Sequence, residues 1–576
     1  MAIDINVKYM RRKSWYRLLL CGVLFAICFP SSAQDLDSDT GYKAQLAAIE
    51  SKLQVGDLEN ALKHIEETLV QYPRGAEVHY AKSLLFAQAG NFQVAVPSAQ
   101  QAVEIAPENV LYNNHLLELY KSQGEFDSAV DLIDQVIERL PENPQIYREK
   151  IMLQHAAKRS EEALDTYSLT RDKFGETDTL DVLKSEILLD LNRKEEATVL
   201  LEHWRKEKSP IRQVYSTLSY IFLDQNEPKA AIRVLKEGVE NSQDDLLFLD
   251  LADANMALKK EDEAYENIKT AFESERVSFM DKHRAMMGLL SGNSPFAVPQ
   301  LQELSNILVL KHPRMPDSHM FKGDVLWMKG ELDQAKSLYL TTVSMNAKHV
   351  DAWRKLVNVE LAQNQLDAAI ADGNEALRHN PGNVIITYFV GVAHMMKKDT
   401  ENARIYLERA LDYSGNENDF VKSMVYGGLG DLYHEIQMDA ASDVAYQEAI
   451  KLDSSNATVL NNAAYYLSLR KKDLNKAEDY ARRANELEPE SGTFQDTYAW
   501  VLFQQERYDE ALKWIEKAVD NSDASAVLFE HYGDILIQLN NKRAAVKQWE
   551  KALAIADDSV NVEKIKQKIS EKKYIE

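Results

Sequence analysis

Three stretches of this sequence share one pattern: Val55–Gly75 reads VGDLENALKHIEETLVQYPRG, Ala89–Asn109 reads AGNFQVAVPSAQQAVEIAPEN, and Gln123–Asn143 reads QGEFDSAVDLIDQVIERLPEN. In each stretch a glycine is followed by apolar residues at three- and four-residue spacing, and then by a proline. The glycines and the prolines both recur every 34 residues: Gly56, Gly90 and Gly124, then Pro73, Pro107 and Pro141. Such spacing predicts amphipathic helices, and a fixed period predicts a chain of repeated helix pairs.

Alanine recurs at the same 34-residue interval through most of the chain. Ala264 comes one residue early, Ser442 replaces the alanine after a slip, and the other positions are Ala61, Ala95, Ala129, Ala163, Ala197, Ala231, Ala335, Ala369, Ala403, Ala477, Ala511 and Ala545. A small side chain lets two helices approach closely, whereas a large one would overpack the contact. Proline then ends the second helix, since it cannot continue the hydrogen-bond ladder. Stacked pairs are expected to share one continuous core.

This period and pattern resemble the tetratricopeptide repeat, in which a first-helix glycine is followed by an alanine, a large apolar residue and a closing proline. In the stretch DTYAWVLFQQERYDEALKWIEKAVD from Asp496, the matching positions are Ala511, Ile515 and Ala518. The first-helix glycine position is filled by Gly323, Gly391, Gly430 and Gly533. The resemblance covers residues 40–558 and implies an all-α, right-handed superhelical solenoid of about 15 helix pairs.

The phase of the repeat divides the chain into blocks. Residues 34–273 and 314–558 carry the repeats, and residues 274–313 are either a diverged repeat or a hinge, with Leu301 where alanine is expected. Residues 559–576 form a lysine-rich amphipathic segment, as expected for the polar helix that caps a solenoid.

Residues 1–33 have the pattern of a signal peptide. A basic region from Met10 precedes the apolar run LLLCGVLFAICF, and small residues follow it, so cleavage is expected between Ala33 and Gln34. A retained signal anchor is the alternative. Both cysteines, Cys21 and Cys28, lie in this segment, so the cleaved chain would contain none. We expect an exported protein, periplasmic or bound to the outer membrane through partners, with no membrane span after cleavage.

Composition and motifs favour a binding protein over an enzyme. The net charge of −24 argues against nucleic-acid partners, because phosphate binding needs clustered Lys and Arg. The sequence contains no H-E-x-x-H, P-loop or G-x-S-x-G motif. Tyr426–Asp431 reads YGGLGD, but its position within a repeat indicates close helix packing. Asp35–Gly41, DLDSDTG, departs from the calcium-loop pattern. We therefore expect no catalysis, no cofactor and no metal.

The resemblance also implies which residues would contact a partner, because the family binds protein segments in a concave groove lined by its first helices. The corresponding positions are Asp431, His434, Asn461, Tyr465, Asp496, Trp500, Phe503, Glu530 and Asp534. Exposed aromatic rings among acidic groups would suit a peptide with apolar anchors and basic flanks. The alternative is that Trp500 and Tyr465 pack between adjacent first helices as core.

The functional prediction is an exported, non-enzymatic scaffold that binds protein or peptide partners in envelope assembly or secretion. A second hypothesis is an accessory subunit of a polysaccharide or cell-envelope assembly machinery, which would contact glycan as well as protein. The oligomeric state is left open.

Overall fold

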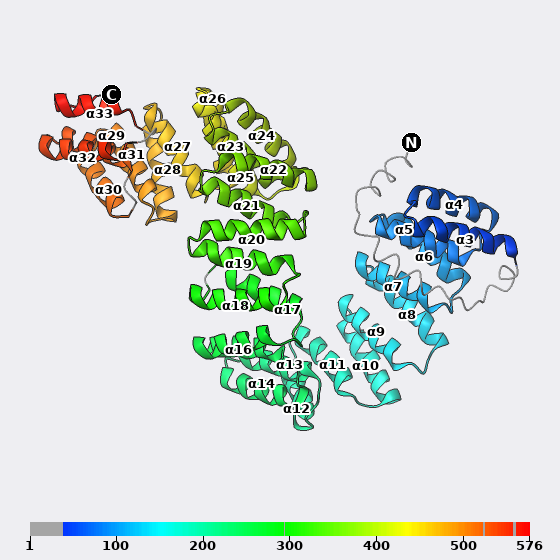
Figure 1. Cartoon of the computed structure of the whole chain (residues 1–576). Coiled ribbons are helices and arrows are strands. Elements are labelled where there is room, and N and C mark those ends of the chain that lie inside the picture. Colours follow the sequence, from blue (N-terminus) through cyan, green and yellow to red (C-terminus); the bar gives the residue numbers. More distant parts are fainter. Residues whose placement is uncertain (1–38, 293, 522–524, 557–559, 576) are drawn as a thin grey trace. The chain divides into compact units, whose positions relative to one another are not determined.

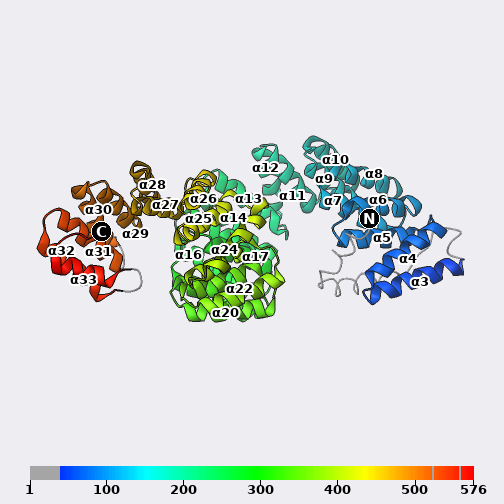
Figure 2. The same ribbon diagram turned by 90° about the horizontal axis from the view of Figure 1, so that it is seen from above.

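The computed structural model describes residues 39–575 except residues 293, 522–524 and 557–559. Within these residues the secondary structure is helical, with 31 α-helices, one short 3-10 helix, η2 (Ser414–Asn416), and no strand. Contacts divide the chain into two compact units that meet between Ala271 and Phe272. Figures 1 and 2 show the helices as consecutive antiparallel pairs, each stacked on the next within its unit. The predicted signal peptide, residues 1–33, lies outside the described residues.

The first unit contains seven helix pairs, the last of which ends just past the boundary. Their helices are α3 (Thr40–Gln54), α4 (Leu58–Gln71), α5 (Ala76–Gln88), α6 (Phe92–Ile105), α7 (Val110–Gln123), α8 (Phe126–Arg139), α9 (Pro144–Ala156), α10 (Ser160–Phe174), α11 (Asp178–Asp190), α12 (Lys194–Lys206), α13 (Arg212–Asp224), α14 (Pro228–Ser242), α15 (Leu247–Ala257) and α16 (Glu261–Glu273).

The second unit contains eight further pairs and one additional helix. They are α17 (Phe279–Leu290), α18 (Val298–Lys311), α19 (Pro316–Met328), α20 (Leu332–Met345), α21 (Val350–Ala362), α22 (Leu366–His379), α23 (Val384–Met396), α24 (Thr400–Tyr413), α25 (Asp419–Glu435), α26 (Asp439–Leu452), α27 (Ala457–Leu469), α28 (Leu474–Leu487), α29 (Gly492–Gln504), α30 (Tyr508–Asn521), α31 (Ala526–Gln538), α32 (Lys542–Ala554) and α33 (Val562–Glu571). Odd-numbered helices are called first helices below, and even-numbered helices second helices.

The turn between first and second helix has the same backbone conformation in most units. Gly56, Gly90 and Gly124 have φ angles of 75°, 73° and 72°. Lys158 and Asn192 continue the 34-residue phase with φ angles of 63° and 57°, although they are not glycines. A left-handed residue ends a helix by redirecting its last carbonyl groups, and glycine adopts that conformation at least cost. The left-handed turn is therefore kept even in repeats where another residue replaces the glycine.

The alanine register predicted from the sequence is confirmed. All thirteen alanines, from Ala61 to Ala545, have no exposed surface, and the serine at the slipped position, Ser442, is equally buried. The Ser442 hydroxyl donates to the carbonyl oxygen of Gly430 across the pair, at 2.8 Å. In the segment 274–313, which contains α17 and α18, Leu301 occupies the alanine position and is also fully buried. This segment therefore has the helical content of a repeat, and its role as a hinge stays a prediction.

The first-helix glycines are explained by close packing against the second helix. A Cβ atom on Gly430 would lie 2.8 Å from Cζ of Tyr446, and one on Gly323 would lie 2.7 Å from Cε1 of Tyr339. Both rings are buried, so they have little room to move. The glycines of the YGGLGD stretch lie inside α25, as the packing interpretation expects.

The additional helix α33 lies where the sequence predicts a cap. Its Ile565 is fully buried and packs with the core around Trp549. Among the described helices, none combines the length and hydropathy needed to cross a membrane.

Candidate functional site

The nine predicted contact residues lie on four consecutive first helices, α25, α27, α29 and α31. The structure places seven of them in two groups. Asp431 and His434 line a cleft on α25 and α27. The residues of α29 and α31 form a second group, which is closed by α33.

The cleft, called the acidic cleft below, has a volume of about 1300 Å³. It is lined by Met395, Asp431, His434, Glu435, Gln437, Asp439, Asn462, Tyr466 and Arg470. Three carboxylates face one guanidinium group in this lining, so the cleft carries a negative excess. A positively charged side chain is the complement that this arrangement favours.

Asp431 stands at the inner wall of the acidic cleft. Its Oδ1 accepts hydrogen bonds from the hydroxyl of Tyr446 and, at 3.1 Å, from Nδ2 of Asn462. Burial raises the pKa of Asp431 to about 6, although these hydrogen bonds oppose the shift. The carboxylate is thus held in place by two neighbouring helices, α26 and α27.

Arg470 and an aromatic stack also line the acidic cleft. The Arg470 guanidinium lies 3.2 Å from Asp439 and 2.6 Å from Asp443, and it also donates to the backbone oxygen of Tyr466. The imidazole of His434 stacks on the Tyr466 ring, with ring centres 3.9 Å apart. Burial lowers the pKa of His434, so its neutral form is favoured and the negative excess of the cleft persists at neutral pH.

The position of Asp431 follows a local rule that recurs in the second unit. In Gly323-Asp324, Gly430-Asp431 and Gly533-Asp534, the glycine lies against an aromatic ring of the second helix and the aspartate accepts a hydrogen bond from that ring. The ring donors are Tyr339, Tyr446 and Trp549.

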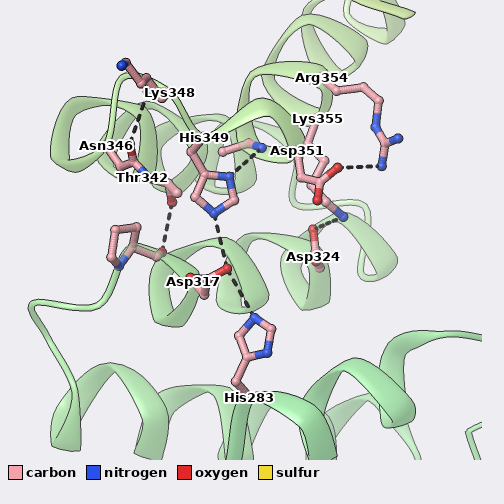
Figure 3. Close-up of polar contacts among 12 residues, drawn as sticks. His283, Asp317, Asp324, Thr342, Asn346, Lys348, His349, Asp351, Arg354 and Lys355 are labelled. Atoms are coloured by element: carbon pink, nitrogen blue, oxygen red, sulfur yellow. Dashed lines mark hydrogen bonds and ion pairs between the residues drawn. The ribbon is translucent and has the colours of Figure 1, made fainter. Parts of the chain in front are cut away.

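Each of these aspartates also contacts a donor on the next first helix: Lys355 at 2.8 Å, Asn462 at 3.1 Å and Lys568 at 2.6 Å. Figure 3 shows the pair Asp324–Lys355. One carboxylate therefore links its own helix pair to the following one.

The second group is called the aromatic row: Trp500, Phe503 and His531. The Trp500 ring lies between the other two, 4.7 Å from the Phe503 centre and 4.0 Å from the His531 centre, and is nearly parallel to both. The Nδ1–H group of His531 donates a hydrogen bond to Oδ1 of Asp496, at 2.9 Å. Burial opposes protonation of His531, but the carboxylates of Asp496, Asp534 and Glu530 together outweigh burial, so the pKa of His531 is raised.

The prediction that these aromatic rings are unburied is wrong. Trp500 is 6% exposed and Phe503 is 4% exposed, because His531 and Tyr574 cover their faces and edges. Asn461 is also buried, and its amide donates to Asn462. Tyr465 is partly buried, with its ring centre 6.5 Å from that of His531. For Trp500, the structure agrees with the alternative interpretation, in which its ring packs between adjacent first helices.

The predicted acidic residues of α31, Glu530 and Asp534, already have a basic partner. Lys568 of α33 is 1% exposed and donates to Oε1 of Glu530 and Oδ2 of Asp534, each at 2.6 Å. Burial raises the pKa of Asp534 to about 6, and Lys568 counteracts that rise.

Sequence reasoning missed Tyr466, Arg470 and Lys568. Lys568 could have been found, because it stands one 34-residue period after Asp534. Tyr466 is adjacent to the predicted Tyr465, so an error of one residue in the register of α27 accounts for its omission.

Comparison with known proteins agrees with the repeat geometry. Models of the tetratricopeptide repeat match residues 46–110, 322–383, 354–418 and 473–526, and a further model of the same repeat matches residues 86–151. The chain is a tetratricopeptide repeat protein. Such repeats are generally non-catalytic and mediate contacts between proteins.

One relative is a tetratricopeptide repeat-containing protein of Methanocaldococcus jannaschii, 22% identical over 264 residues, which are 41% of this chain and 45% of that protein. The match therefore spans less than half of the relative's length. Among solved structures, a tetratricopeptide repeat protein from Parabacteroides merdae is 16% identical, with 45% of this chain and 98% of that chain covered and a TM-score of 0.35. The Cut9–Hcn1 hetero-tetramer of the APC/C is 15% identical, with 80% and 96% covered and a TM-score of 0.38.

Another polar cluster joins three successive first helices, α17, α19 and α21. Oδ1 of Asp317 is 3.3 Å from Nε2 of His283 and 3.2 Å from Nε2 of His349 (Figure 3). The hydrogen bond with His349 lowers the pKa of Asp317, and the same bond raises the pKa of His349. Among the described residues no group of three or more His, Cys, Asp and Glu side chains is arranged to hold a metal ion. We assign this cluster to the packing of first helices.

Proposed function

We propose that this protein is an interaction scaffold whose acidic cleft binds a basic side chain of a protein partner. The main support is the excess of negative charge in the cleft. Asp431, Glu435 and Asp439 line a cavity of about 1300 Å³, and Arg470 is the one Lys or Arg among its lining residues. Arg470 is already paired with Asp439 and Asp443. A lysine or arginine of a partner would therefore meet Glu435 and Asp431 as available acceptors.

The residues that line the cleft are suited to binding a guanidinium or ammonium group. Asp431 is fixed by hydrogen bonds from two helices, so little side-chain freedom is lost when a ligand binds. The stacked rings of His434 and Tyr466 offer an aromatic surface beside the carboxylates. Arginine gains from such a surface, because its planar cation stacks on aromatic rings while bonding to carboxylates.

We also propose export as the setting, on the signal-peptide pattern of residues 1–33. Envelope assembly or secretion would then be the process served. The glycan-binding alternative receives less support, since a sugar platform needs exposed ring faces and Trp500 and Phe503 have little exposed surface.

The proposal is tested by reversing one charge of the cleft. The tagged Glu435→Lys protein and the native protein are used to capture partners from extracts of the source organism at two salt concentrations. Glu448→Lys is the matched control, because Glu448 lies on the second helix α26 outside the cleft. We expect Glu435→Lys to lose the salt-sensitive partners and Glu448→Lys to keep them. Equal capture by all three proteins would refute the cleft as the binding site.

A further inference from the structure

The chain's own segment Lys572–Ile575 covers the aromatic row. Helix α33 ends at Glu571, and the next residue, Lys572, has a φ angle of 51° that turns the backbone back. Tyr574 then lies edge-on against Phe503, with ring centres 5.3 Å apart. Phe503 belongs to α29, two first helices before α33, so this short segment reaches across the intervening helix α31.

Helix α33 and the covering segment together have the chemistry predicted for a partner of this surface. The ammonium group of Lys568 lies 5.5 Å from the centre of the Tyr574 ring and bonds to Glu530 and Asp534. A cation and an aromatic ring are thus presented together to acidic and aromatic groups. The sequence SEKKYI places two further lysines directly before the tyrosine.

Helix α33 has contacts with the core besides those made by Tyr574 of this segment. Ile565 is fully buried and packs against the core around Trp549, and Lys568 is held by two carboxylates. Lys573, by contrast, is 63% exposed and pairs with Glu571, the last residue of α33. The segment after Glu571 can therefore leave its place while α33 remains docked.

The aromatic row contains a donor that nothing in the described part of the chain satisfies. The indole nitrogen of Trp500 is buried and has no hydrogen-bond acceptor among the described residues. A buried donor without a partner is costly, and a bound backbone carbonyl would satisfy it.

We propose that residues 572–575 are an internal occupant of a docking site on the aromatic row. A partner segment with a tyrosine or other aromatic residue directly after basic residues displaces them. The inference deepens the proposed scaffold function by adding a second, self-covered contact surface, but it does not depend on the acidic cleft. Because the occupant is tethered, it competes at high effective concentration, and only a tighter-binding segment opens the site.

The test uses the full chain and the peptide acetyl-Glu-Lys-Lys-Tyr-Ile-amide, the sequence of residues 571–575. Saturation-transfer NMR of the peptide, at millimolar concentration, reports contact of its tyrosine ring with the protein. The protein variant is Tyr574→Ala, which removes the covering ring and leaves Lys568 and Ile565 in place. Lys573→Ala is the matched control, and a peptide with alanine in place of tyrosine controls for charge alone.

We expect a tyrosine-ring signal several-fold stronger with Tyr574→Ala than with the native protein or with Lys573→Ala. Adding Phe503→Leu to Tyr574→Ala should abolish it, with circular dichroism confirming that this protein is folded. An equal signal with native protein and Tyr574→Ala would overturn self-coverage, and no signal with either would overturn the docking site. If no partner binds in the acidic cleft, the Glu435→Lys experiment will show it. The two proposals can therefore be refuted separately.

Discussion

The ammonium group of Lys568 lies 2.6 Å from Oδ2 of Asp534, its counterpart one 34-residue repeat earlier. Asp324 with Lys355 and Asp431 with Asn462 make the same link between consecutive first helices. In each case the aspartate also accepts a hydrogen bond from an aromatic side chain of its own pair. Stacking in this protein is therefore maintained by polar links as well as by apolar burial.

The first prediction concerns the last of these links. Lys568→Met should destabilise the second unit by about 3 kcal/mol, because it leaves two largely buried carboxylates without their cation. Urea unfolding followed by circular dichroism measures the change. Lys566→Met is the matched control on the exposed side of α33, and it should change stability by less than about 0.5 kcal/mol. Similar stabilities for the two variants would argue against the link.

The second prediction tests the glycine contact. Gly430→Ala should cost roughly 1–3 kcal/mol, since the added Cβ would lie 2.8 Å from a buried tyrosine ring. Gly288→Ala, in the helix α17, meets nothing within 4 Å and should be neutral or stabilising by up to about 1 kcal/mol. Thermal unfolding distinguishes the two, and a stable Gly430→Ala protein would show that the ring can move.

The third prediction tests the alanine register in the first unit. Ala129→Leu should destabilise by roughly 1–3 kcal/mol, because Ala129 has no exposed surface. Gln135→Leu, at an exposed position of the same helix, controls for added hydrophobicity. Hydrogen exchange of α7 and α8 locates the effect, and unchanged exchange with Ala129→Leu would place the contact elsewhere.

These contacts show what the sequence can predict. The phase of the alanines gives the helix pairs and their register, since a buried small residue is required once in each repeat. The exposure of Trp500 could not be obtained in this way, because it depends on whether His531 of the next first helix stacks on it. Likewise, Tyr574 covers Phe503 only because the backbone turns at Lys572, and no repeat position encodes that turn.

The fourth prediction is a pH dependence at Asp317. The pKa of His349 is raised, so its contribution to stability is complete below its unfolded value of about 6.5 and is lost as pH rises through the folded value. The pKa of Asp317 is lowered, so its contribution is lost only as pH falls below about 4. His349→Gln should therefore cost roughly 1 kcal/mol more at pH 5.5 than at pH 9.

The control for this pH dependence is His319→Gln, because Nε2 of His319 bonds to the uncharged backbone oxygen of Pro313. Urea unfolding at the two pH values provides the measurement. A cost of His349→Gln that is the same at both pH values would mean that the Asp317 bond does not depend on protonation of His349.

Site-specific photo-crosslinking can test whether a partner protein binds in the acidic cleft. p-Benzoylphenylalanine is placed at Glu435, which lines the cleft, and separately at Glu448 on α26, outside it. Both full-length proteins are irradiated in cells of the source organism, and the adducts are identified by mass spectrometry. We predict a discrete adduct from position 435 whose partner is crosslinked through a segment containing lysine or arginine, and none from position 448. Adducts of equal yield from both positions, or adducts from position 448 alone, would contradict the claim.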